Sequence, residues 1–312
     1  MASMRLCPKK KTPTPVDPGT IPAAMRPQYH HESQAEIVPA AVFMKGPGMG
    51  LALLRAGLAA TLLFAVAGNA AAGERTDLET LFEAEGVNGT FVLFDVEKDE
   101  LTAVDAERAE RRFPPASTFK IANSLIALET GAVADVDEVL PYGGKPQPFK
   151  QWERDMSLRK AIAVSNVPVY QEVARRIGLE RMKEMLSKLD YGNRDPGTVV
   201  DRFWLDGPLE ISANEQARFV TALATNTLPL SNRSQEMVRE ILLMEEIGGA
   251  KLYGKTGWLF HDDEVDIGWF VGWVEREGKI YSFALNIDMD DKEQVGLRVP
   301  LAKKLLRELD VL

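Results

Sequence analysis

The order of secondary-structure patterns along the chain is the feature that most restricts its fold. Strand patterns occur at residues 90–105 and again after residue 250, whereas the patterns at residues 117–245 are almost all helical. Strands at both ends of a chain, with helices between them, are typical of a sheet that the C-terminal part completes. The sequence therefore predicts an α+β fold: an antiparallel sheet, flanked by N- and C-terminal helices, with an inserted helical lobe.

The individual elements follow from periodicity and from the residues that begin or end them. Helices are expected over residues 76–85, 117–130, 158–164, 169–177, 180–189, 213–225, 235–244 and 299–308. Strands are expected over residues 90–96, 101–105, 251–260, 267–276 and 280–289, the first two as a hairpin. A cleft between the sheet and the helical lobe is the expected place for a binding site.

The first 72 residues differ in composition from the rest of the chain. Residues 1–43 are rich in Pro and Ala without apolar periodicity, which predicts an unstructured extension or a misassigned start. Residues 44–72 combine flanking basic residues, an apolar run at 56–67 and small residues at 70–72, the order of a secretory signal peptide. The run is too short to cross a bilayer as a stable helix, and the alternative is a buried helix of the domain.

This interpretation predicts how the chain is processed. An export signal normally begins a chain, so we expect translation to start at Met44 or Met49 and cleavage near Ala72. The mature protein, residues 73–312, is then expected in the bacterial periplasm without a stable membrane anchor.

Charge and missing residue types exclude several classes of function. The 7 basic and 3 acidic residues of the first 72 leave 30 basic and 43 acidic residues in the remaining 240. This excess of acid disfavours a nucleic-acid partner, because phosphate binding needs a positive surface. The same 240 residues contain no Cys and a single His, His261, which excludes thiolate nucleophiles, disulfides and His/Cys zinc sites. His261 lies in a polar, loop-like stretch. If these 240 residues form an enzyme, its general base is therefore expected to be Lys or a carboxylate.

A Ser-x-x-Lys motif begins the most apolar helix pattern of the chain. Ser117 and Lys120 share one helix face, and the residues that follow are almost all apolar. Burial disfavours the ammonium form, so Lys120 is a candidate neutral base beside a hydroxyl nucleophile. The alternative is that Ser117 caps the helix and Lys120 reaches solvent. In a second copy, Ser157 precedes two adjacent cations and is expected to be only a helix cap.

Further motifs follow in a specific order. The whole set consists of Ser-x-x-Lys at 117–120, Ser-x-Val at 165–167, Tyr-Gly-Asn at 191–193, Phe-Trp-Leu at 203–205 and Lys-Thr-Gly at 255–257. Ser165 stands at a helix start, where it could be a cap. The glycine-flanked strand at 255–257 permits the close approach of a ligand, whose carboxylate a Lys and a hydroxyl could hold. This set resembles the class D serine β-lactamases, the oxacillinases, over essentially all of residues 76–312. Related class A enzymes and penicillin-binding proteins have Asn in the place of Val167.

The resemblance implies a mechanism for β-lactam hydrolysis and antibiotic resistance. Ser117 would attack the lactam carbonyl to form an acyl-enzyme. Lys120 would be carboxylated by carbon dioxide or bicarbonate and would act as the base for acylation and deacylation. Ser165 would relay protons toward the leaving nitrogen, with Lys255 nearby, and the backbone N–H groups of Ser117 and Trp258 would form the oxyanion hole.

The resemblance also implies the surroundings of these groups. The carboxylated lysine would be surrounded by Phe119, Val167, Leu205 and the indole N–H of Trp204. The substrate would be bound by Lys255, Thr256, Gly257 and Arg298, with Tyr191 as cleft wall. Arg298 has an alternative as a capping or surface cation. No metal site is expected, because the acidic residues 288–293 lack EF-hand spacing.

Three points stay open at the level of sequence. Penicillins are the expected small-molecule substrates, whereas the detailed spectrum depends on loops near residues 136–152 and 258–266. The protein is expected to be a monomer or a homodimer. The alternative interpretation is a penicillin-binding sensor or cell-wall peptidase that is acylated without efficient turnover. Sensor domains are attached to membrane-spanning segments, and peptidases normally have Asn at the position of Val167.

Overall fold

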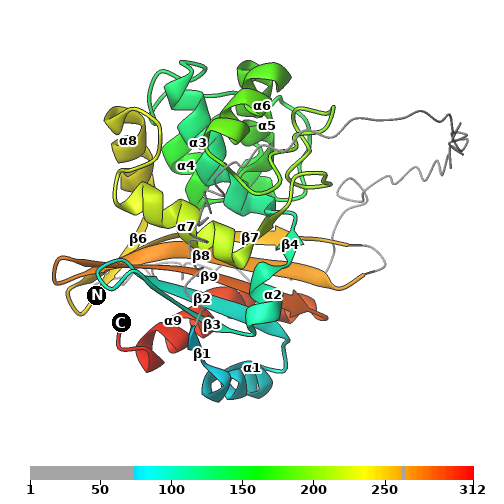
Figure 1. Ribbon diagram of the computed structural model, residues 1–312. Helices are drawn as coiled ribbons and strands as arrows, with labels where there is room; N and C mark the ends of the chain where they lie inside the picture. Colours follow the sequence, from blue (N-terminus) through cyan, green and yellow to red (C-terminus); the bar gives the residue numbers. More distant parts are fainter. Residues whose placement is uncertain (1–72, 262–263) are drawn as a thin grey trace, which may run out of the picture. The chain divides into compact units, whose positions relative to one another are not determined.

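A computed structural model describes residues 73–261 and 264–312 (Figure 1). The expected extension (1–43) and signal peptide (44–72) lie outside the described residues. The large sheet contains β1 (Gly73–Glu74), β2 (Gly89–Asp95), β3 (Glu100–Val104), β6 (Leu243–Ile247), β7 (Ala250–Leu259), β8 (Asp266–Arg276) and β9 (Lys279–Met289). A second, small sheet pairs β4 (Arg112–Phe113) with β5 (Ile211–Ser212).

The helices largely follow the expected pattern. They are α1 (Glu79–Glu85), α2 (Ala106–Glu110), α3 (Lys120–Glu129), α4 (Leu158–Ala163), α5 (Val167–Ile177), α6 (Leu179–Lys188), α7 (Ala213–Ala224), α8 (Asn232–Leu242) and α9 (Arg298–Glu308). Short 3₁₀ helices cover Thr76–Leu78, Ala116–Phe119, Lys150–Trp152 and Lys292–Leu297. Within the described part of the chain, no helix is long and apolar enough to span a membrane.

The strand order of the large sheet is β1-β3-β2-β9-β8-β7-β6. All neighbouring pairs are antiparallel except β1 and β3, which pair in parallel. The C-terminal strand β9 lies between the N-terminal β2 and β8, so the two ends of the domain complete one sheet. This arrangement confirms the expected α+β fold and adds one parallel pair at an edge.

Both faces of the sheet are covered, as alternate residues of β8 show. Phe270 and Val274 belong to a core with α9, whereas Val271 and Trp273 belong to a core with the helical lobe. Because successive strand residues point to opposite faces, these two cores lie on opposite sides of the sheet. Figure 1 shows α1 and α9 on one side and α3 to α8 on the other. The helical lobe is organised around α3, whose residues from Lys120 to Leu128 are all buried.

One expected helix boundary was wrong. The helix expected to reach residue 244 ends at Leu242, and Leu243 begins the edge strand β6. Leu243 and Met244 extend the apolar sequence pattern of α8 by two residues, but their side chains are exposed on the strand. The tight turn at Gly248 and Gly249 then returns the chain into β7. Periodicity alone could not separate these two uses of apolar residues.

Candidate active site

The candidate nucleophile lies on a turn that helix α7 and strand β8 hold in place. Ser117 belongs to the 3₁₀ helix Ala116–Phe119, which leads directly into α3. The hydroxyl of Thr118 donates to the carbonyl of Pro115 at 2.7 Å and accepts from the amide of Gln216, on α7, at 2.8 Å. The indole of Trp269, on β8, donates to the preceding carbonyl of Pro114 at 3.0 Å. The turn therefore has a fixed position relative to the sheet.

Ser117 and Lys120 form the central pair of the site. Nζ of Lys120 lies 2.8 Å from Oγ of Ser117, and the lysine side chain is completely buried. Burial lowers the pKa of Lys120 well below its ordinary value, and the nearby charge of Lys255 lowers it further. The lowered pKa favours the neutral form of the amine, which is within reach of the hydroxyl proton of Ser117. The expected alternative, a lysine that reaches solvent, does not apply.

The second Ser-x-x-Lys copy lies elsewhere in the fold. Ser157 is the residue that precedes α4, but its hydroxyl makes no capping hydrogen bond. It does not line the cavity that holds Ser117. The structure thus separates the two copies, although the expected cap bond at Ser157 is absent.

A cavity of about 320 Å³ opens beside Ser117, where the helical lobe meets the sheet. Its lining includes seven of the residues predicted for the site: Ser117, Ser165, Val167, Leu205, Thr256, Trp258 and Arg298. They come from the nucleophile turn, α5, the loop before β5, strand β7 and α9. Residues far apart in the sequence therefore converge at the expected cleft.

Ser165 lies between α4 and α5 in a left-handed backbone conformation, with φ of 55°. The cap of α5 is its neighbour Asn166, whose Oδ1 accepts from the backbone N–H of Val169 at 3.0 Å. Since Asn166 performs the capping, the expected alternative for Ser165 is not realised. The hydroxyl of Ser165 is left at the cavity wall.

Strand β7 brings a second buried cation to the site. Lys255 is 5% exposed, and burial together with the charge of Arg298 lowers its pKa to about 7. Arg298 donates to the carbonyl of Gly257 at 2.6 Å, and burial lowers its own pKa to about 10. It also donates to the carbonyl of Val295 at 2.7 Å, so the expected capping contact and the cavity position coexist. Arg298 lines the cavity, and Nζ of Lys255, which does not, donates to the carbonyl of the lining residue Thr256 at 2.8 Å, so two basic groups lie at this corner and favour an anion there.

Close packing explains why the third residue of the Lys-Thr-Gly motif, Gly257, is a glycine. A Cβ on Gly257 would lie 3.1 Å from the carbonyl oxygen of Pro115 and 3.1 Å from Cγ2 of Thr118. Strand β7 thus approaches the nucleophile turn as closely as a backbone without side chain allows. The next residue, Trp258, is held by a 2.7 Å hydrogen bond from its indole to Asp266.

Trp204 carries an unusual polar group. Its side chain is completely buried and stacks on Phe119, with ring centroids 5.4 Å apart. The indole Nε1 has no hydrogen-bond partner among residues 73–261 and 264–312. Buried donors are nearly always satisfied, so an unpaired one points to an acceptor that the polypeptide itself does not supply.

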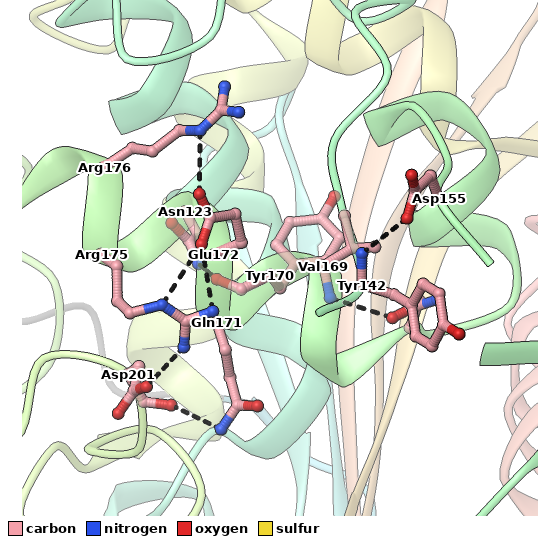
Figure 2. Close-up of polar contacts among 11 residues, drawn as sticks. Asn123, Tyr142, Asp155, Val169, Tyr170, Gln171, Glu172, Arg175, Arg176 and Asp201 are labelled. Carbon is pink, nitrogen blue, oxygen red and sulfur yellow. Dashed lines mark hydrogen bonds and ion pairs between the residues drawn. The ribbon is translucent and has the colours of Figure 1, made fainter. Parts of the chain in front are cut away.

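The loop that carries Trp204 is anchored to α5. The backbone carbonyl of Asp201 accepts from the Gln171 amide at 3.1 Å, and its carboxylate accepts from Arg175 at 2.7 Å (Figure 2). Arg175 also contacts Glu172 on the same helix. These bonds fix the start of the segment that places Trp204 beside Phe119.

Tyr191 does not reach the cavity. It is 1% exposed, and its ring packs against Phe119 and Phe219 at centroid distances of 5.7 and 4.9 Å. The expected position on the cleft wall is therefore occupied by other residues, and Tyr191 is a core residue behind Phe119. A motif identifies the residue type, but it does not show which way a ring turns.

The structure also brings residues to the cavity that the sequence did not single out. Arg202 and Asp206 pair with each other at its wall. Phe149 and Trp152, which close another side, belong to the segment 136–152 that the sequence indicated only as a loop. Arg202 and Asp206 flank the Phe-Trp-Leu motif, and that position was the available signal. The acidic residues at the end of β9 and after it have other partners, because Asp288 binds Arg108 and Asp291 caps a 3₁₀ helix. Within the described residues, no cluster of three or more His, Cys, Asp or Glu could hold a metal ion.

A serine beside a buried lysine of lowered pKa, on a turn packed against a Lys-Thr-Gly strand, defines a penicillin-recognising serine enzyme. Residues 89–307 match the penicillin binding protein transpeptidase domain. The chain is 41% identical over 235 residues to the β-lactamase OXA-10 of Pseudomonas aeruginosa, which covers 75% of this chain and 88% of that protein. It is 44% identical over 220 residues to OXA-48 of Klebsiella pneumoniae, covering 70% of this chain and 83% of that protein.

Solved structures agree with the sequence comparison. The class D β-lactamase FUS-1 (OXA-85) of Fusobacterium nucleatum subsp. polymorphum superposes with a TM-score of 0.74 at 43% identity, covering 77% of this chain and 100% of that chain. The class D β-lactamase YbXI from Nostoc gives a TM-score of 0.73 at 37% identity, covering 75% and 99%. The chain belongs to the class D serine β-lactamase family.

Proposed function

We propose that the protein hydrolyses β-lactam antibiotics, penicillins foremost, through an acyl-enzyme on Ser117 and thereby confers antibiotic resistance. The observation that carries the proposal is the 2.8 Å contact between Ser117 Oγ and the buried Nζ of Lys120. In acylation, Ser117 Oγ forms a bond to the lactam carbonyl carbon, and the ring C–N bond breaks. In deacylation, water cleaves the resulting ester and frees Ser117.

The residues around Lys120 fit a carboxyl group on its amine. The amine is neutral and can react with carbon dioxide, the walls are apolar, and the unpaired indole N–H of Trp204 is a donor for an anion. Phe119, Val167 and Leu205 would line the group. Once formed, it supplies the general base for both acylation and deacylation.

The remaining residues bind and orient the substrate. The backbone N–H groups of Ser117 and Trp258 are the proposed oxyanion hole, in which one donor typically lowers the barrier by ~3 kcal/mol. Thr256, Lys255 and Arg298 bind the substrate carboxylate, in the corner where two cations already favour an anion. Ser165, free of a capping role, passes a proton to the leaving nitrogen.

The test is a time course of penicillin hydrolysis with the purified protein and two serine variants. We expect many turnovers per molecule, with no loss of rate when a chelator is added. Ser117→Ala should lower kcat by at least about 10³-fold, as for other catalytic serines, because among residues 73–261 and 264–312 no other hydroxyl hydrogen-bonds to the lysine amine. Ser157→Ala, the matched control, should keep nearly full activity.

Mass spectrometry with a slowly hydrolysed β-lactam should then place the acyl group on Ser117. An adduct on Ser157 would reverse the assignment of the two motifs. A single stoichiometric burst without further turnover would instead indicate a penicillin-binding sensor.

A further inference from the structure

Tyr170 lies directly beside Lys120, and no sequence motif identifies it. It follows Val167 by one turn of α5, so both point toward the same side of the helix, and it is completely buried. The centre of its ring is 5.4 Å from Nζ of Lys120, with the nitrogen over the ring face. This is within the distance at which an aromatic face attracts a cation.

Hydrogen bonds at both ends of Tyr170 fix this geometry. Its hydroxyl shares a 2.8 Å hydrogen bond with Ser124 Oγ, which in turn donates to the backbone carbonyl of Lys120 at 2.8 Å. The amide of Asn123 donates to the backbone carbonyl of Tyr170 at 3.2 Å (Figure 2). Tyr170 is therefore held by α3, the same helix that begins with Lys120, and its side chain cannot swing away from Lys120 without breaking the hydroxyl bond to Ser124.

Two neighbours of the amine favour its charged form. Nζ of Lys120 donates to Oγ of Ser117, whose oxygen stabilises the ammonium, whereas Lys255, backed by Arg298, repels a proton from the side of β7. No carboxylate within the described part of the chain pairs with Lys120. The face of the Tyr170 ring is the second group that favours the ammonium, and it takes no part in the proposed acyl transfer.

We propose that Tyr170 is a positioning residue that sets the proton affinity of Lys120, and with it the pH above which Lys120 takes up carbon dioxide. This inference rests on the proposed function. In carboxylation, the lone pair of the neutral amine forms a bond to the carbon of carbon dioxide, one C–O π pair moves to oxygen, and the amine releases a proton to solvent. The ammonium has no lone pair to react. The negative ring face stabilises that ammonium and disfavours the anionic product, so Tyr170 raises the pH at which the group forms.

The test changes the charge of the ring face and leaves the shape of the side chain nearly intact. Position 170 is occupied by Tyr, by Phe (Tyr170→Phe) or by 3,4,5-trifluorophenylalanine, whose ring face is electron-poor. Two quantities are followed against pH: the ¹³C NMR signal of a carbamate after addition of ¹³C-bicarbonate, and the rate of the first acylation by a slow penicillin. Lys120→Ala is the control that must lack the carbamate signal.

We expect Tyr and Phe to share one pH midpoint, because both present the same ring face. The trifluorinated ring should lower that midpoint by about 0.5 to 1 pH unit, which is the loss of a typical cation–π contact. An unchanged or higher midpoint overturns the inference, since the ring would then act only as an apolar wall. A wild type that is fully active without a carbamate signal would overturn the proposed carboxylation, while the pH midpoint of acylation would still decide the role of Tyr170.

Discussion

Three basic side chains cluster at the candidate site, Lys120 and Lys255 buried and Arg298 half-buried, although the protein as a whole is acidic. Lys120, Lys255 and Arg298 all have a pKa below the ordinary value, and burial is the largest cause in each case. The same burial that prepares a neutral amine for chemistry also destabilises the fold, because the unfolded chain can hold the protons freely. The site therefore opposes folding at neutral pH.

This opposition predicts a pH dependence of stability at Lys255. Its pKa of about 7 in the folded protein lies below the ordinary value of 10.5, so the unfolded chain binds more protons between these values. The free energy of unfolding should therefore rise by a few kcal/mol between pH 7 and pH 10 on account of this lysine. In Lys255→Met that part of the rise should be missing. Urea unfolding of both proteins at four pH values measures the difference, and parallel curves would contradict it.

The motifs indicated the residues that we propose to react, and they indicated fewer of the residues that hold them in position. Ser117, Lys120 and Lys255 could be predicted because hydroxyl and amine groups in apolar surroundings are rare and informative. Gln216 and Tyr170 could not, because their partners Thr118 and Lys120 are about 100 and 50 residues away. Such contacts exist only after the chain has folded.

At the scale of the element, β7 and β8 pair unusually closely next to the site. Gly254 and Gly272 face each other across these two strands. A Cβ on Gly272 would lie 2.0 Å from the carbonyl oxygen of Tyr253, and one on Gly254 would lie 2.7 Å from Cε2 of Phe270. Because backbone atoms of a central ladder cannot move aside, these positions exclude a side chain.

Gly272→Ala should consequently destabilise the protein by about 3 kcal/mol or more, at the upper end of overpacking effects. For a domain of this size, that corresponds to a decrease in Tm of roughly 6 to 12 °C. Gly296→Ala is the matched control, since no atom lies within 4 Å of its added Cβ. Thermal unfolding followed by circular dichroism compares the two, and equal Tm values would show that the ladder can widen.

Element prediction succeeded where a pattern extended over several turns or alternations. The expected β2–β3 hairpin and the strands β7, β8 and β9 agree with the structure to within one or two residues. The two-residue strands β1, β4 and β5 are too short to have a period, and their pairing depends on distant partners. The boundary between α8 and β6 was missed because apolar residues continue across it.

At the scale of the whole molecule, sequence patterns supplied the architecture but not the strand order. The register that places Phe91 opposite Leu285 depends on side-chain packing across the sheet, which no local window contains. The inserted lobe and the cleft could be predicted, because a long helical stretch between two sets of strands leaves few alternatives. The proposed periplasmic location depends on residues 44–72, outside the described structure.

Export gives the corresponding prediction. When the full gene is expressed in a Gram-negative host, N-terminal sequencing of the periplasmic protein should begin near Gly73, because small residues at 70–72 follow the apolar run directly. Ala70→Asp and Ala72→Asp together should block cleavage and retain activity in the membrane fraction. A periplasmic protein that still carries residues 1–43 would contradict both the cleavage and the later start.

The outer wall of the cavity is formed in part by residues that are not buried and carry none of the proposed acyl-transfer groups: Gln147, Pro148, Phe149, Gln151 and Phe260. Mutations in such loops alter the room available to an antibiotic side chain while the serine, both lysines and the central sheet keep their packing. Under antibiotic selection, single substitutions in this wall can therefore change which β-lactams the protein hydrolyses while the protein still folds. Replacing one β-lactam with another in treatment would then select variants that keep this fold and differ in the outer wall of the cavity.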